Sequence, residues 1–396
     1  MTFVFRQSVR RVAFASLVAT TALATILPAE AIEPTGNEIA DAFLAGVEAS
    51  GTTALAVGAV SGDDDTTEIV ALEATIKDGN DLSKVSIDRI VIDEADLVDG
   101  RIEAGSITMS GVAITNDDGK FTAGKASATG VRIPSAADIG SGPDAIAAQS
   151  VYDGGRVEGI VIADKDGFTV PIESVEFDAD DIVDGVARKG TLAANRIVVD
   201  VATMPDEDTK AELAKLGYKR LTLSFSASGA WDPASAVATL DKLQLSAEDA
   251  GTLTISARIG GLTEAVVEQL KTTTDTDQTT QLLQGLTIQE LSIGYQDASL
   301  TNRLLSAQAQ ETGTTAETLA DQLATALPAM LSMIKNPTFE KSVAAAAGTF
   351  LRSPGSISAT AKPASPVPIA MIVGTVMMAP QTLPDVLNVE VVSTGK

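Results

Sequence analysis

The sequence contains neither cysteine nor histidine. Without them the chain has no disulfides and lacks the side chains that build the usual zinc, haem and iron–sulfur sites. Every Ser–His or Cys–His nucleophile is excluded as well. Only carboxylates, Lys, Tyr and Ser/Thr remain for chemistry, so we expect a protein that is not an enzyme. A hydrolase built on paired carboxylates is the catalytic alternative.

Aromatic residues and cations are also scarce. Aromatics make up 4% of the chain, which argues against a cleft that stacks on sugars. The chain has 28 Lys and Arg against 53 Asp and Glu, a net charge of −25. Because like charges repel, nucleic acid and anionic membrane surfaces are poor partners. Apolar residues reach 45%, enough for one or two sizeable cores.

The N-terminus has the three parts of a secretory signal peptide over residues 1–31. Three arginines precede an apolar stretch from Val12 to Leu27, and Ala29-Glu30-Ala31 fits the small-x-small rule, so cleavage is expected after Ala31. The stretch is shorter than the roughly 20 residues that a bilayer span requires. We therefore expect export by the general secretory route to the periplasm, or alternatively to the extracellular space, with no transmembrane segment after cleavage.

A strand-like pattern recurs along the chain. It has apolar residues at i, i+3 and i+5, then Asp at i+9 followed by another apolar residue, and its copies begin at Ile87, Ile172, Leu240 and Ile288. A related pair of units begins at Gly111 and Gly159. The apolar residues at i+3 and i+5 share one face, as in a half-buried strand. The step from i to i+3 breaks this alternation and indicates a bulge or a strand start.

These units predict an α+β, mainly β fold: an extended curved antiparallel sheet built from repeated strand units, with an N-terminal helix and a C-terminal Ala-rich helical region. The N-terminal helix spans Thr35 to Ala49, with Thr35 and Glu38 spaced as a capping box. Thr272 to Thr280 is interpreted as an exposed linker. The expected organisation is 1–31 signal peptide, 32–84 N-terminal helix and first strands, 85–298 repeat-built β region, and 299–396 helical region with closing strands.

Two acidic clusters offer the oxygen ligands that Ca²⁺ prefers. Calcium is the one cofactor that the sequence leaves open, and no copy completes an EF-hand loop. The alternative is that these are solvated hairpin turns, where Asp is favoured by the backbone. The candidate ligands are Asp63, Asp64, Asp65, Asp178, Asp180, Asp181 and Asp184.

The last apolar run extends from Ile369 to Ala379 between prolines and is too short to span a bilayer. The first interpretation is a helix buried in the C-terminal core. The alternative is a Met-rich, adaptable contact for an apolar ligand or a partner, made by Ile369, Met371, Met377 and Met378.

The β units Leu240–Asp249 and Gly251–Ile259, with the signal peptide and the Ala-rich tail, resemble periplasmic β-rich envelope proteins of Gram-negative bacteria, near the AsmA-type proteins. The resemblance covers about residues 85–300 and has no diagnostic motif. It implies a curved sheet with a hydrophobic groove, although such relatives usually keep a membrane anchor. The expected function is non-catalytic binding of a lipid-like ligand or of another envelope component. The alternative is a calcium-stabilised structural or surface protein.

Overall fold

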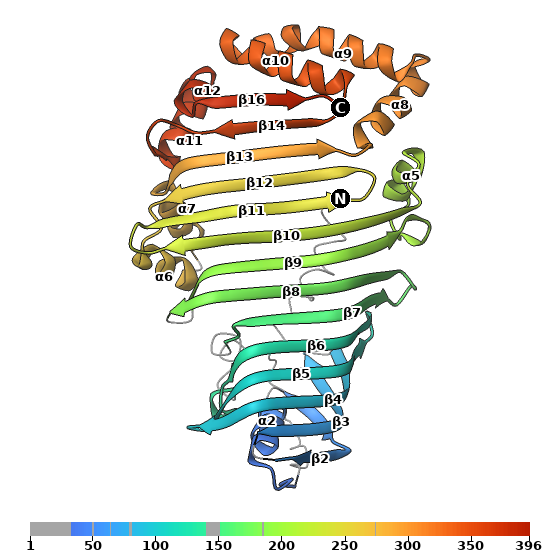
Figure 1. Cartoon of the computed structure of the whole chain (residues 1–396), viewed down its shortest axis with the longest axis vertical. Helices are drawn as coiled ribbons and strands as arrows, with labels where there is room; N and C mark the ends of the chain where they lie inside the picture. The colour runs from blue at the N-terminus through green and yellow to red at the C-terminus, as the bar shows by residue number, and fades with distance from the viewer. Residues whose placement is uncertain are drawn as a thin grey trace. The chain divides into compact units, whose positions relative to one another are not determined.

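The computed structural model describes residues 33–49, 51–63, 65–78, 81–139, 151–183, 186–273 and 275–396. The predicted signal peptide lies outside these residues. The chain divides into two compact units, Met1–Ala187 and Arg188–Lys396. This boundary falls inside the predicted repeat region 85–298. Most of the elements are labelled in Figure 1.

The first unit is an antiparallel sheet with one helix packed on it. The sheet order is β1-β3-β4-β5-β6-β7-β8, and β2 pairs with β3. The elements are α2 (Glu38–Ala49), β1 (Thr52–Ala56), β2 (Ala59–Gly62), β3 (Thr66–Asp78), β4 (Asp81–Val98), β5 (Arg101–Asn116), β6 (Gly119–Ile133), α3 (Ala136–Ile139), β7 (Gly154–Asp164) and β8 (Thr169–Val183).

Helix α2 covers the part of the apolar face that β3, β4 and β5 form. Ala40 and Leu44 of α2 form one core with Ile69, Ile90 and Ile92 of β3 and β4, and all five are buried. The helix begins at Glu38, and the side chain of Asn37 accepts a hydrogen bond from the Ala40 amide at 2.9 Å. The predicted capping box at Thr35 is therefore wrong, because the hydroxyl of Thr35 donates to Asp41 instead, at 2.7 Å.

The break in alternation inside the repeats is a local interruption of the strand ladder. In β4, Ile87 and Ile90 are both buried, and the paired register skips Asp88 and the opposite Gly111. Gly111 has φ +63°, a conformation that glycine adopts without a steric penalty. The register also skips one position after Ile172, and it shifts after Leu240 and Ile288. The predicted irregularity is confirmed in all four copies.

The second unit is an antiparallel sheet of order β9-β10-β11-β12-β13-β14-β16, with β15 paired to β13. Its elements are β9 (Val186–Asp200), η2 (Val201–Thr203), α5 (Glu207–Lys215), β10 (Arg220–Asp232), β11 (Val237–Ala247), β12 (Gly251–Gly260), α6 (Glu264–Thr272), α7 (Thr276–Gln284), β13 (Thr287–Asp297), α8 (Leu300–Thr312), α9 (Ala316–Leu331), η3 (Ser332–Ile334), α10 (Pro337–Arg352), β14 (Ser356–Ala361), β15 (Val367–Pro368), α11 (Ile369–Met378), η4 (Pro380–Thr382), α12 (Leu383–Val386) and β16 (Val389–Thr394).

The predicted fold class is confirmed. Strands take up 49% of the chain and pair antiparallel, with a helix before them and several helices near the C-terminal end. The linker prediction for 272–280 is wrong from Thr276 onward, where α7 begins. The side chain of Asp275 caps α7 by accepting from the amides of Asp277 and Gln278. Helix α5, which lies between β9 and β10, was not predicted.

Candidate functional site

The two faces of the second unit's sheet have different chemistry. The strand register places apolar residues opposite one another on a single face, here called the apolar face. One row of it crosses seven strands and consists of Leu192, Ala227, Leu243, Ile255, Ile293, Ala359 and Val391. The next row contains Phe225, Leu245, Leu253, Tyr295 and Ile357. Since residues two apart share a face, both rows lie on the same side of the sheet.

The opposite face is rich in hydroxyl groups. Neighbouring strands bring hydroxyls together across the ladder, as in Ser246 with Thr252 at 3.1 Å and Ser292 with Thr360 at 3.0 Å. A row from this face contains Ser226, Gln244, Thr254, Gly294, Ser358 and Val392. Antiparallel sheets with one polar and one apolar face place the polar one in water, and they need a cover for the other.

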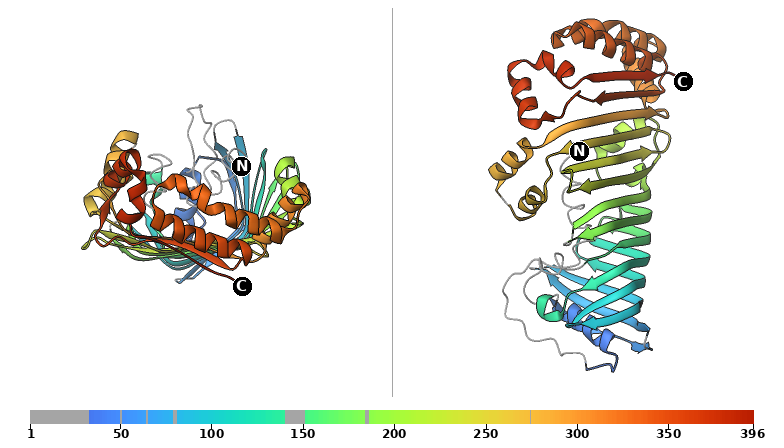
Figure 2. Two further views of the ribbon diagram at one scale, coloured as in Figure 1. Left: turned by 90° about the horizontal axis from the view of Figure 1, so that it is seen from above. Right: turned by 60° about the vertical axis from the view of Figure 1, so that its left-hand side comes forward.

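The apolar face is covered by helix at one end and remains partly open further along. Helix α10 packs on β14 and β16, and Phe350 meets the ring of Tyr295 edge-on, with centroids 6.0 Å apart. Leu192, Leu245, Leu291 and Ile293 are 43%, 45%, 43% and 47% exposed. In Figure 2 (left) α9 and α10 lie on one side of the strands, and the other helices of this unit lie near the strand ends. Large aliphatic side chains therefore reach solvent in the middle strands.

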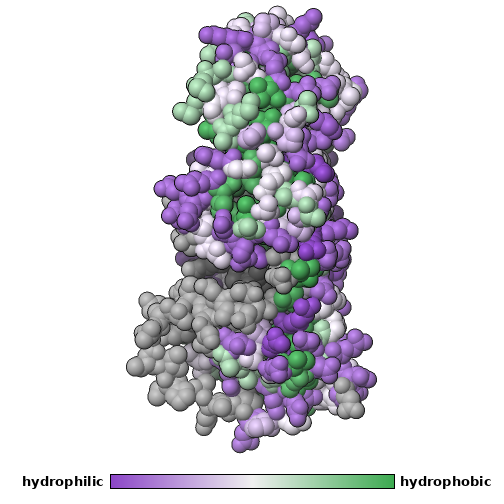
Figure 3. All heavy atoms as spheres, turned by 90° about the vertical axis from the view of Figure 1, so that its left-hand side faces the viewer, coloured by the Kyte–Doolittle hydropathy of each residue, from purple (hydrophilic) through white to green (hydrophobic). Residues whose placement is uncertain are grey.

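Helix α11 adds a second exposed apolar surface. The interpretation of residues 369–379 as a helix buried in the core is wrong, because no residue of α11 is buried. Met371 is 51% exposed, and Met377 and Met378 are 81% and 84% exposed. Ile369 is half-buried, and its amide donates to the Leu286 carbonyl at 2.9 Å. Figure 3 shows the side of the molecule on which α11 lies, where hydrophobic residues gather in the upper part of the view.

A buried polar cluster connects β13 to α8. The carboxylate of Asp297 is fully buried, and its Oδ1 accepts from the Thr301 amide at 2.8 Å and the Tyr295 hydroxyl at 3.2 Å. Its Oδ2 has no hydrogen-bond partner, and the ammonium of Lys396 lies 3.9 Å away. Burial, together with the charge of Asp297, raises the pKa of Tyr295 from 10.0 to about 12. The single hydroxyl proton of Tyr295 is shared between Asp297 and the Ala250 carbonyl, which lies at 3.2 Å as well.

A cation–π contact between Arg303 and Tyr218 lies at the same end of the sheet. The guanidinium of Arg303 lies 4.4 Å from the ring centroid of Tyr218, and it also donates to the Leu216 carbonyl at 2.9 Å. Tyr218 is buried with Val201 and Ala250. These contacts join α8 to α5 and the strand ends, so the cluster explains how the two helices are held.

The first group of predicted calcium ligands lies at the turn between β2 and β3. Oδ1 of Asp63 accepts from the backbone amides of Asp65 and Thr66, at 3.1 and 3.0 Å. This is the turn-forming role of Asp. Asp64 lies outside the described residues.

The second group lies in β8 and near its end. Asp178, Asp180 and Asp181 are exposed, Asp181 has φ +54°, and Asp184 lies outside the described residues. Among the residues that the structure describes, no three His, Cys, Asp or Glu side chains converge as metal ligands. The calcium prediction gains no support from the geometry.

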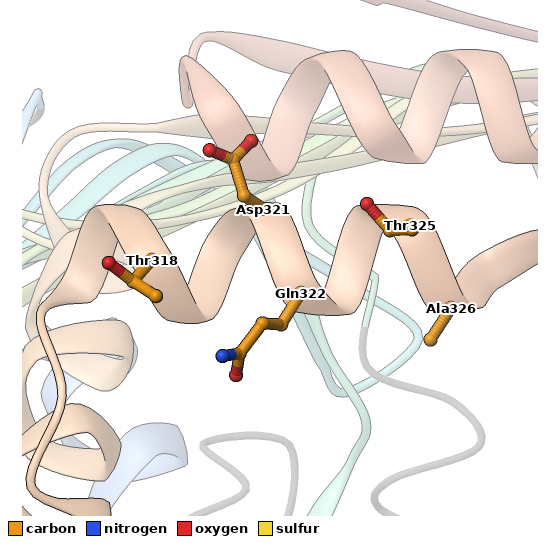
Figure 4. Close-up of a pocket in the computed structure, with 5 residues that line it drawn as sticks. All are labelled: Thr318, Asp321, Gln322, Thr325 and Ala326. Atoms are coloured by element: carbon orange, nitrogen blue, oxygen red, sulfur yellow. The ribbon is translucent and has the colours of Figure 1, made fainter.

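Figure 4 shows a shallow pocket on the surface of α9. Its lining comes from a single helix and consists of Thr318, Asp321, Gln322, Thr325 and Ala326. Asp321 is paired with Arg352 of α10 at 2.7 Å. Because no second element contributes lining residues, the pocket brings no set of functional groups together.

The comparisons with known proteins point to the second unit. A family model described as "Uncharacterized protein" matches residues 244–394, which include most of the apolar face and α11. No curated protein matches the chain. Across the described ranges, no helix has the length and apolar character needed to cross a membrane.

Proposed function

We propose that this protein is a non-catalytic binding protein that holds an apolar, lipid-like ligand against the apolar face of the second unit. One observation carries the proposal: Leu192, Leu245, Leu291 and Ile293 are nearly half exposed on a face whose rows are otherwise mostly aliphatic or aromatic. Fully burying a Leu or Ile stabilises by about 1.5–3 kcal/mol. Covering these four exposed parts would therefore contribute roughly 3–5 kcal/mol before the costs of binding.

The same face indicates which ligands fit. It offers hydrocarbon along several strands, whereas most of the hydroxyl groups lie on the other face. The net charge of −25 disfavours an anionic headgroup. A neutral lipid with a long acyl chain is the best match. The predicted signal peptide supports a periplasmic place of action, and the lack of His and Cys supports a role without catalysis.

Two matched substitutions test this function. Ile293 on the apolar face and Val392 on the hydroxyl face are 47% and 50% exposed. We expect Ile293→Glu to weaken binding of a fluorescent monoacylglycerol about tenfold, since the new carboxylate would lose water beneath the acyl chain. Val392→Glu should bind as the unmodified protein does. Equal effects of the two substitutions, or no binding by the unmodified protein, would contradict the proposal.

A further inference from the structure

We propose that α11 docks the protein onto a lipid bilayer surface whose headgroups carry no net charge. This inference goes beyond the proposed function, because it concerns a different surface. It would stand even if the apolar face of the sheet bound no ligand.

The first observation is an apolar helix that the chain leaves uncovered. Met371, Val373, Val376, Met377 and Met378 are 51%, 45%, 50%, 81% and 84% exposed. They project from several sides of α11, so the helix is apolar around most of its circumference. A helix of this kind is normally buried in a core or in lipid. An exposed apolar patch of this kind marks a binding surface.

The second observation is the charge. No Asp, Glu, Lys or Arg occurs from residue 363 to 384, between Lys362 and Asp385, although the whole chain carries −25. The nearby helix α7 contributes Asp277 and its cap Asp275, both negative. An anionic membrane would repel these two aspartates and the rest of the negatively charged molecule. A neutral lipid surface matches the uncharged segment.

The third observation is that α11 offers almost nothing but hydrocarbon. Its one hydroxyl, on Thr375, donates to the Met371 carbonyl within the helix at 2.8 Å. Protein interfaces carry about one hydrogen bond per 100–200 Å² and a polar rim. A lipid surface requires neither. Flexible methionine side chains also adapt to the irregular packing of acyl chains.

The start of helix α11 is fixed to the sheet through β15. Immediately before it, β15 pairs with Thr287 and Ile288 of β13, and Val367 is buried there. Ten residues of α-helix measure about 15 Å, half the roughly 30 Å of a hydrocarbon core. Helix α11 would therefore lie in the headgroup region and immerse its side chains without crossing the membrane.

Flotation of residues 32–396, the chain without its predicted signal peptide, with phosphatidylcholine vesicles tests the inference. The variant Met377→Glu/Met378→Glu should lower the partition coefficient about tenfold or more. The control Met330→Glu/Met333→Glu changes two methionines that are 64% and 85% exposed outside α11. It should partition within twofold of the unmodified protein. Adding phosphatidylglycerol to the vesicles should weaken binding, and circular dichroism would confirm that both variants fold.

Three outcomes would overturn the inference. They are no flotation of the unmodified protein, equal losses in the two variants, or a protein that dimerises without vesicles and becomes monomeric through the α11 substitutions. The last result would assign α11 to a second copy of the chain. Monoacylglycerol binding should survive in the α11 variant, so failure of this inference and failure of the proposed function are distinguishable.

Discussion

Replacing Gly111 by alanine tests whether the interruption of strand pairing in the repeat requires glycine at this position. Gly111 has φ +63°, and a Cβ placed there would overlap the carboxylate of Asp88 and lie 2.9 Å from its Cβ. The left-handed conformation costs an L-residue about 1–2 kcal/mol. The side chain of Asp88 is exposed and can turn away, so relieving the overlap costs about 0.5–1.5 kcal/mol more. We therefore expect Gly111→Ala to lower the free energy of unfolding by roughly 1.5–3.5 kcal/mol.

Gly124 is the matched control. It lies in β6, has no positive φ, and its added Cβ would come no closer than 3.6 Å to the Glu158 carbonyl oxygen. Gly124→Ala should change stability by less than about 1 kcal/mol, because alanine fits a strand without strain. Urea unfolding followed by far-UV circular dichroism gives both values, with unchanged m-values as the check on compactness.

A double variant separates the two costs. Asp88→Ala/Gly111→Ala should recover the part that comes from the overlap with the carboxylate, and leave the close approach of the two Cβ atoms and the backbone cost of about 1–2 kcal/mol. Our explanation would be refuted by a loss below about 0.5 kcal/mol in Gly111→Ala, or by equal losses at Gly111 and Gly124.

The remaining predictions concern the buried cluster and the acidic turns. Asp297→Ala should cost about 1.5–3 kcal/mol in urea unfolding, since the Thr301 amide loses a charged acceptor, whereas Asp297→Asn keeps that acceptor and should cost less; an equal cost would contradict this role. The raised pKa of Tyr295 favours the protonated hydroxyl in the folded state, so its stabilising contribution is complete below pH 10 and declines as the pH rises to about 12. Tyr295→Phe should flatten that alkaline decline, and an unchanged profile would exclude Tyr295 as its cause. Chelator should leave the melting temperature within about 2 °C, because Asp63 forms a turn and no three acidic side chains of the described residues converge as ligands; a larger fall would favour the calcium alternative.

Strand positions could be predicted because apolar and polar residues alternate along much of the sequence. The repeated apolar spacing identifies the strand cores, and the glycines that open the related pair, Gly111 and Gly159, both have φ +63°. The sequence places a glycine at these positions because a side chain there would be strained. The partner that would be crowded, Asp88, could not be predicted, since it depends on how two strands pair.

The missed helices lack strong apolar periodicity. Helix α5 has the acidic first turn and the cap that announce a helix: Asp206 accepts from the Thr209 amide at 2.7 Å, and this bond lowers the pKa of Asp206. Helix α7 begins in a Thr- and Gln-rich segment whose composition is typical of a linker, so only the cap at Asp275 signals it. The caps at Asp206 and Asp275 are therefore the sequence signals that identify these two helices.

The candidate site could be predicted only in part. Alternation of Leu243 and Leu245 with Gln244 and Ser246 already predicts one apolar and one polar face. Whether the apolar face is covered depends on where distant helices pack, which no local pattern fixes. The run from Ile369 to Met378 was misjudged for the same reason, because an all-apolar helix looks alike in sequence whether it is buried or exposed.

The two units have similar strands but differ in how far helices cover the apolar face of the sheet. In the first unit α2 covers the apolar face over β3 to β5, and Ile69 and Ile90 are fully buried. In the second unit α10 covers one end of the corresponding face, and Ile293 reaches solvent. The strand pattern alone cannot account for this difference, since apolar residues repeat in both. Burying aliphatic side chains stabilises the fold, which explains the covered face of the first unit. The exposed face of the second unit lacks this stabilisation, and binding an apolar ligand is the role that would offset the loss.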